Sequence, residues 1–326
     1  MKTIIVNVCR FLLAATFLFS GFVKANDPYG MAYKLSDYFS AFGLSYSEHF
    51  CLVSAVVLAL VEWGLGIGLF FALSRRITSF ISLIFMLAFT ALTGYILVTG
   101  AVSDCGCFGD AIVLTNGQTF AKNIVLLAAA AVCAYWPSSM FLIIPGCIGR
   151  IIRSALFLAL LVYALVCIYT LPLIDFRPYR VGYDMNELVD LPVEGVSGVK
   201  VPRYDAAGFY VQTATEGEDV TENIFSDDKA ILIIAPDLTS IKESYADEIN
   251  TLYDFAIQHH YSFYFITASN EDLRQDWKQR TSAHYPFYIS EDRILKTVIR
   301  ANPGLVVITN GTITTKSSHL STTHLQ

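Results

Sequence analysis

Long apolar stretches dominate the first half of the chain. About 20 mostly apolar residues are enough for a helix to cross a bilayer. Five stretches reach that length, namely 4–24, 50–73, 77–99, 119–140 and 152–173. The first also fits a cleaved signal peptide, with Val23-Lys24-Ala25 as the cleavage site. Between the first two stretches, the aromatic spacing in 25–49 predicts a short amphipathic helix lying on the membrane surface.

A different pattern begins after residue 173, where short apolar runs alternate with amphipathic segments. The runs predict strands at 209–213, 230–234, 262–267, 284–289, 305–309 and 312–316, and the segments between them predict helices at 241–259, 271–280 and 291–300. Asn310-Gly311 lies between the last two strands and is typical of a tight hairpin turn. Strands that alternate with helices and end in a hairpin indicate an α/β domain.

The balance of basic and acidic residues changes at the same boundary. Residues 1–173 hold 9 Lys and Arg against 6 Asp and Glu, which leaves 13 against 22 for residues 174–326. An acidic second half argues against binding nucleic acid, which requires a basic face. Basic residues of membrane proteins collect on the cytoplasmic side. The groups that define this side are Lys2 with Arg10, Arg75 with Arg76, and Arg150 with Arg153. Loops 25–49 and 100–118, and everything after residue 173, are therefore expected on the extracytoplasmic side.

All seven cysteines lie at or before Cys167, so the second half cannot carry out thiol chemistry alone. Cys105 and Cys107, separated by Gly106, follow the third apolar stretch on the expected oxidising side. A disulfide between them would close a small strained ring, and strained exposed disulfides exchange readily. Three interpretations remain open: redox exchange, a structural disulfide, and metal binding. Two thiolates supply only half of a tetrahedral metal site, and no histidine is near in the sequence.

The motif is flanked by Asp104 and Asp110, whose charges would tend to raise the pKa of the thiols and oppose a reactive thiolate. Cys51 starts the second stretch on the outer side and could act as a resolving thiol. It could equally be a small buried apolar side chain, as could Cys167 in the fifth stretch.

Glu62 lies inside the second apolar stretch. A charge in the bilayer costs about 3 kcal/mol on insertion scales, so it normally faces the protein interior and has a partner. Lys24, at the outer end of the first stretch, is a candidate partner, although it could also extend to the lipid headgroups. Glu62 is expected to have either a structural or a functional role.

These residues resemble known families. Residues 4–140 resemble the DoxX-like four-helix membrane proteins and are similar to the branch that includes the methylamine-utilisation protein MauE. The resemblance rests on residues 10–28 (RFLLAATFLFSGFVKANDP), on the Glu62-x-x-x-Gly66 segment, and on residues 104–110 (DCGCFGD). It implies a role in thiol–disulfide chemistry of exported proteins in the bacterial inner membrane, together with a thioredoxin-like partner.

The second half resembles a thioredoxin-like domain. In that family a cis-proline precedes the terminal hairpin beside the active thiols, and Pro303 matches it. The active cysteines should follow residue 235, but residues 236–242 contain none, and the usual closing helix is absent or degenerate. Another kind of α/β module therefore remains an alternative.

The sequence thus predicts an α-helical polytopic membrane bundle, with four DoxX-like helices and a fifth span, followed by an α/β thioredoxin-like domain. The expected boundaries are 1–145 for the four-helix domain, 146–176 for the fifth span and exit, and 177–326 for the periplasmic domain. The expected function is a thiol–disulfide relay that uses Cys105 and Cys107, with Glu62 handling a proton, a quinone as electron partner, and Pro303 in a docking surface for an exported client. A non-catalytic membrane scaffold is the alternative, and a transporter is a third hypothesis.

Overall fold

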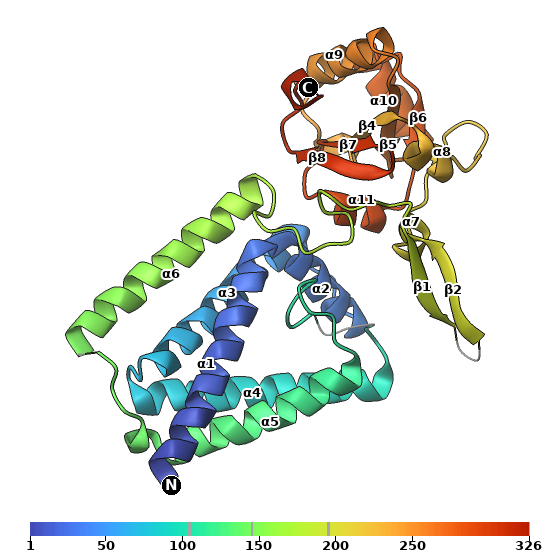
Figure 1. Cartoon of the computed structure of the whole chain (residues 1–326). Helices are drawn as coiled ribbons and strands as arrows, with labels where there is room; N and C mark the ends of the chain where they lie inside the picture. Colours follow the sequence, from blue (N-terminus) through green and yellow to red (C-terminus); the bar gives the residue numbers. More distant parts are fainter. Residues whose placement is uncertain (103–105, 145, 194–195, 326) are drawn as a thin grey trace. The chain divides into compact units, whose positions relative to one another are not determined.

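The computed structural model describes residues 1–102, 106–144, 146–193 and 196–325. The chain forms two compact units, Met1–Ile174 and Asp175–Gln326. Their boundary falls where the apolar stretches end and the acidic composition begins, so the two halves of the sequence fold separately. Figure 1 labels the elements of both units.

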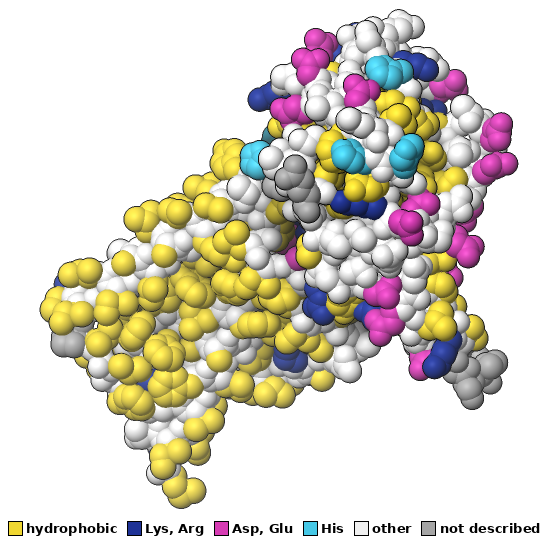
Figure 2. All heavy atoms as spheres, turned by 45° about the horizontal axis from the view of Figure 1, so that its top comes forward, with side chains coloured by type: hydrophobic (Ala, Val, Ile, Leu, Met, Phe, Trp, Pro, Cys, Tyr) yellow, Lys and Arg dark blue, Asp and Glu magenta, His cyan; other side chains and the backbone are white. Residues whose placement is uncertain are grey.

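The first unit is a helical bundle. Among the described residues, five helices are long and apolar enough to cross a membrane, which confirms the five predicted spans. They are α1 (Lys2–Asn26), α3 (Glu48–Phe70), α4 (Arg75–Thr99), α5 (Asn116–Tyr135) and α6 (Gly146–Tyr169), and the shorter α2 (Pro28–Ala41) and η1 (Pro137–Ser139) connect them. On the face drawn in Figure 2, hydrophobic side chains cover most of this unit, as expected for a surface that contacts lipid.

Local sequence signals explain where several helices begin. The Asp27 carboxylate accepts a hydrogen bond from the Gly30 amide, and Pro28 occupies the first position of α2. Thr115 and Gln118 form a reciprocal capping box at the start of α5. Each cap satisfies amides that the first turn of a helix leaves without a partner.

α1 and α3 pack at very short distance because glycines lie at their interface. A Cβ atom on Gly21 of α1 would lie 2.8 Å from the Ala59 carbonyl oxygen, and one on Gly66 of α3 would lie 2.9 Å from the Leu18 amide nitrogen. Only glycine lets the two backbones approach this closely, which is the usual way in which helices associate in lipid.

α6 belongs to the same unit. The Trp63 indole nitrogen donates to the Leu156 carbonyl, and the Asn26 side chain accepts from the Tyr163 hydroxyl. The same Asn26 also exchanges two hydrogen bonds with the backbone of Ile174, donating to its carbonyl and accepting from its amide. The last residue of α1 therefore holds both the fifth span and the segment that follows it.

The second unit is built on a mixed sheet of six strands. They are β3 (Gln212–Thr213), β4 (Lys229–Ile234), β5 (Ser262–Thr267), β6 (Phe287–Ile289), β7 (Gly304–Thr309) and β8 (Thr312–Ser317), in the spatial order β3-β6-β5-β4-β7-β8. β4, β5 and β6 run parallel to one another, whereas β7 is antiparallel to β4 and to β8.

Two helices connect the parallel strands, α9 (Tyr245–Gln258) between β4 and β5 and α10 (Glu271–Thr281) between β5 and β6. A third helix, α11 (Asp292–Val298), leads from β6 to the antiparallel β7. Two short turns of helix, η2 (Leu238–Ser240) and η3 (Thr322–Leu325), lie before α9 and after the last strand. α9 buries Ile249 and Leu252 against the sheet, and the fully buried Trp277 of α10 donates a hydrogen bond to the Tyr285 hydroxyl. The strand–helix alternation and the terminal hairpin predicted from the sequence are present.

Other parts of this unit differ from the predictions. The strand expected at 209–213 is only the two-residue β3, because Phe209 and Val211 are buried in an irregular segment, where Thr221 Oγ1 accepts from the Val211 amide. The sequence patterns also missed the two-stranded hairpin of β1 (Leu188–Val193) and β2 (Val196–Pro202), and the short helices α7 (Arg203–Ala206) and α8 (Thr221–Ser226).

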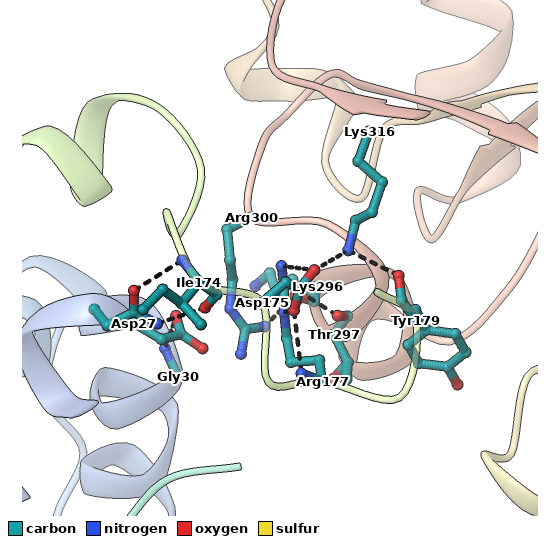
Figure 3. A network of polar contacts seen from close by, with 11 residues as sticks. Asp27, Gly30, Ile174, Asp175, Arg177, Tyr179, Lys296, Thr297, Arg300 and Lys316 are labelled. Carbon is teal, nitrogen blue, oxygen red and sulfur yellow. Dashed lines mark hydrogen bonds and ion pairs between the residues drawn. The ribbon is translucent and has the colours of Figure 1, made fainter. Parts of the chain in front are cut away.

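A buried ionic network fixes the start of this unit (Figure 3). Asp175 forms a bidentate ion pair with Arg177, at 2.7 and 2.9 Å, and a second ion pair with Lys316 of β8 at 2.6 Å. Arg177 also donates to the Thr297 carbonyl of α11, and Lys316 donates to the Tyr179 carbonyl. Burial alone would raise the pKa of Asp175, but the two cations outweigh it and lower that pKa to about 2.

Candidate functional site

The site forms where the last turn of α1 meets the middle of α3. Lys24 and Glu62 are both about 3% exposed, and the Lys24 Nζ lies 2.9 Å from Glu62 Oε2 and 3.2 Å from Oε1. The sequence suggested this partner, and the structure pairs the two residues. Pairing offsets the cost of placing two charges in an apolar bundle.

The Lys24 ammonium has two further acceptors. It donates to Ser20 Oγ at 2.6 Å and to the Cys107 carbonyl oxygen at 2.9 Å. Ser20 in turn donates its hydroxyl to the same carbonyl at 2.7 Å. An ammonium group has three N–H donors, so Glu62, Ser20 and Cys107 together satisfy it completely. The buried ion pair therefore binds the backbone of the Cys-Gly-Cys motif.

The residues around Cys107 are fixed by packing as well. The Phe108 ring contacts the Phe19 ring edge-on, with centroids 5.3 Å apart, and Lys122 Nζ lies 4.2 Å from the Phe108 centroid. Gly106 and Gly109 adopt positive φ angles of 59° and 51°, which are costly for other residues. The turn from Gly106 to Asp110 is thus held by α1 on one side and by α5 on the other.

Of the two motif cysteines and the two acidic residues beside them, the structure describes one of each, Cys107 and Asp110. Cys107 is partly exposed, so its side chain remains accessible although its carbonyl is bound. Asp110 is exposed. Cys105 and Asp104 lie outside the described residues. The prediction that Cys105 and Cys107 exchange a disulfide therefore stays a prediction.

The other cysteines singled out in the sequence are buried. Cys51 is 1% exposed and belongs to an apolar cluster with Met31, Ala32 and Ala55. Cys167 is also 1% exposed on α6. Burial in an apolar cluster is what a structural role would produce, and the resolving role for Cys51 remains untested. In the described part of the chain, no three His, Cys, Asp or Glu side chains gather in a way that could hold a metal ion.

Pro303 lies in the second unit, directly before β7. The Asn302–Pro303 peptide bond is cis. The Asn302 side chain donates to the Asp237 carbonyl and to Ser240 Oγ, both at 2.7 Å. Residues 236–242 and Pro303 are therefore neighbours, and this surface contains hydroxyl and amide groups.

Sequence reasoning missed several contributors to the site. Ser20 lies one helical turn before Lys24, a spacing that could have indicated the contact. Phe108 was treated only as part of the motif. Arg10, which the sequence assigned to the inner side, is fully buried in the bundle, where its guanidinium lies 4.4 Å from the Phe11 ring centroid and 4.6 Å from that of Phe141.

The fold and the site together define a polytopic membrane protein with a glycine-packed bundle and a cysteine motif anchored on a buried ion pair. Residues 2–136 match the model of a family described as methylamine utilisation protein MauE. The membrane unit is therefore MauE-like, and the match ends before α6 and the second unit. Neither a curated protein nor a solved structure matches the chain.

Proposed function

We propose that this protein is a membrane component of an extracytoplasmic thiol–disulfide relay, in which Cys105 and Cys107 exchange a disulfide with an exported thioredoxin-like partner or client. One observation carries the proposal. The Cys107 carbonyl is fixed by Lys24 and Ser20, whereas its side chain stays partly exposed. A reactive sulfur has to be both oriented and accessible.

The exchange involves two displacements at sulfur. A client thiolate attacks one sulfur of the Cys105–Cys107 disulfide, which forms a mixed disulfide and releases the other motif cysteine as a thiolate. A second client thiolate then attacks the mixed disulfide. The client leaves oxidised, and the motif gains two electrons and takes up two protons. We propose a lipid-soluble quinone as the two-electron acceptor that restores the motif disulfide, with Glu62 carrying a proton.

The second unit is proposed to be a thioredoxin-like docking module in the periplasm. The β5-β4-β7-β8 order, with β4 parallel to β5 and antiparallel to β7, supports this fold. Its surface around Pro303 lacks thiols and would bind the client without reacting with it. A DoxX-like origin of the four helices α1, α3, α4 and α5 is proposed in the same sense.

Trapping of mixed disulfides tests the relay. Because the exchange is reversible, the single motif thiol left in Cys107→Ser or Cys105→Ser can attack the disulfide of an oxidised client. The second motif cysteine that would resolve this mixed disulfide is missing, so we expect at least one variant to accumulate a client adduct in cells. The adduct should be absent in the double variant, and Cys147→Ser serves as a control at an exposed cysteine outside the motif. The relay is excluded if neither single variant captures a protein and both motif cysteines are reduced in wild-type cells.

A non-catalytic membrane scaffold is the second candidate. It is favoured by the second unit, in which all thiols are missing. In that case Cys105→Ala combined with Cys107→Ala would leave the cellular phenotype intact, whereas deletion of residues 185–326 would abolish it. The relay predicts that the cysteine double variant alone abolishes the phenotype.

A further inference from the structure

A basic pocket lies at the opposite end of the membrane unit from the cysteine motif. It has a volume of about 880 Å³ and lies between the α3–α4 link, the residues around η1, and the first turns of α6. Four arginines line it: Arg75, Arg76, Arg150 and Arg153. No described residue that lines it is acidic.

The charge at this end is not balanced within the unit. The six acidic residues of residues 1–173 are Asp27, Asp37, Glu48, Glu62, Asp104 and Asp110. The five that the structure describes lie in the middle or at the other end of the helices, and Asp104 lies outside the described residues. Arg75 already donates to the Met140 carbonyl at 2.7 Å, so the charge of the group is shared with the backbone there. Arginine guanidinium groups gathered without carboxylates still favour an external anion, and their fork of donors fits phosphate oxygens.

Helix geometry adds to the attraction. The first turn of α4 contributes Arg75 and Arg76, and the first turns of α6 contribute Arg150 and Arg153. Helix N-termini carry partial positive charge and amides without intrahelical partners, which favours anions. Among the described residues, no side chain caps the start of α4. Two helix starts and four arginines therefore favour the same kind of ligand.

The surroundings indicate where the anion comes from. Ile77 and Leu142 line the pocket and are exposed, and Phe141, Ile148 and Ile151 extend the exposed apolar surface beside it. A soluble anion would gain nothing from this surface, whereas the acyl chains of a lipid would cover it. Basic pockets between membrane helices suit anionic headgroups in general.

We propose that this pocket is a binding site for an anionic phospholipid whose headgroup carries two phosphodiesters, such as cardiolipin. The phosphates lie against the arginines, and the acyl chains lie along the exposed apolar side chains of α4 and α6. The volume lies within the range of roughly 300–1,000 Å³ that ligand pockets commonly span. This site is independent of the thiol chemistry proposed above.

Native mass spectrometry of the full chain in a neutral detergent tests the site by titration with cardiolipin. We expect Arg76→Gln combined with Arg153→Gln to weaken cardiolipin binding about tenfold or more, because two cationic contacts to the anionic headgroup are lost. Lys2→Gln is the matched control. It removes one charge at the same end of the bundle but outside the pocket, and it should change the affinity less than twofold.

Two further titrations distinguish the ligand classes. Phosphatidylcholine should bind at least tenfold more weakly than cardiolipin, and millimolar pyrophosphate should not displace cardiolipin. Equal binding of cardiolipin by the double variant and the wild type would overturn the proposal. Equal binding of phosphatidylcholine, or displacement by pyrophosphate, would also overturn it, because the first removes the charge preference and the second makes the ligand a soluble phosphate.

Discussion

Lys24 contacts three acceptors from three separate parts of the chain. Glu62 comes from α3, Ser20 from the preceding turn of α1, and the Cys107 carbonyl from the loop after α4. Each contact lies in or beside an apolar bundle, where an unpaired charge is expensive. Removal of the ammonium therefore affects both the bundle and the motif.

We predict that Lys24→Met destabilises the protein by about 3–5 kcal/mol, because it leaves Glu62 buried without a cation. Equilibrium unfolding in detergent micelles measures this loss. Lys24→Met combined with Glu62→Leu removes both charges and should recover most of the stability. If the double variant is no more stable than Lys24→Met, the ion pair is not the source of the effect.

Asp175 makes the stability of the second unit depend on pH. Its pKa of about 2 in the folded state lies below the unfolded value of about 3.9, so folding favours the carboxylate. The stabilisation, about 2 kcal/mol, is complete above about pH 4 and is lost as the pH falls toward 2. Lys316 changes the stability in the same direction with pH, but in the alkaline range. Burial, aided by Arg177, lowers its pKa to about 8, so its contribution to stability rises as the pH increases above 8.

Hydrogen exchange of peptides from β8 between pH 5 and pH 2.5 measures the loss of the stabilisation that Asp175 provides. Other carboxylates also titrate in this range, so the decisive quantity is the difference from Asp175→Asn. We expect the wild type to lose protection more steeply than this variant as the pH falls. Parallel pH profiles for the two proteins would show that Asp175 does not contribute.

At the scale of elements, α1 and α3 pack closely because the glycines at their interface have no side chains. We predict that Gly66→Ala destabilises the bundle by about 1–3 kcal/mol, because the added methyl group would meet the Leu18 backbone at 2.9 Å. Gly64→Ala is the matched control on the same helix, where the nearest atom is 3.8 Å away. Thermal unfolding of the two variants in the same detergent compares them, and equal midpoints would contradict close helix packing at Gly66.

Elements with a strong periodic signal were predictable from the sequence, whereas contacts between distant segments were not. The five spans and the strands β4, β5, β7 and β8 each follow from one local run of apolar residues. The strand expected at 209–213 was too long, because Phe209 and Val211 are buried without strand pairing, so their apolar character is no guide to secondary structure.

The candidate site was predictable in part for the same reason. A charge within an apolar span requires a partner, which led from Glu62 to Lys24. The binding of the Cys107 carbonyl could not be predicted, since backbone acceptors leave no trace in the sequence. The contacts of Asn26 with Tyr163 and Ile174 join residues more than 130 positions apart, and no local pattern marks them.

At the scale of the whole molecule, the distribution of basic residues predicts a sidedness that labelling can measure. The second unit has no cysteine, so Gln258→Cys at the exposed end of α9 introduces a single reporter there. We expect a membrane-impermeant maleimide to label this residue in intact spheroplasts, because residues after 173 are predicted to be periplasmic.

Cys147 is the internal control for this measurement. It is exposed at the start of α6, beside the arginines that are predicted to lie on the cytoplasmic side. It should react only after the membrane is permeabilised. Labelling of Cys147 in intact spheroplasts, with Gln258→Cys protected, would invert the topology and remove the motif from an oxidising compartment.

The contacts of Lys24 also imply an order of events during synthesis. Glu62 follows Lys24 by 38 residues and Cys107 follows it by 83. The ribosome therefore delivers the carboxylate one hairpin before the carbonyl. Lys24 and Glu62 can therefore form their ion pair in the nascent chain as soon as α1 and α3 pack together. The turn that contains Cys107 is synthesised later and binds to a pair that has already formed. A chain stalled after α3 would already contain the Lys24–Glu62 ion pair. A chain stalled after Asp110 would be the first in which the Cys107 carbonyl can bind to it.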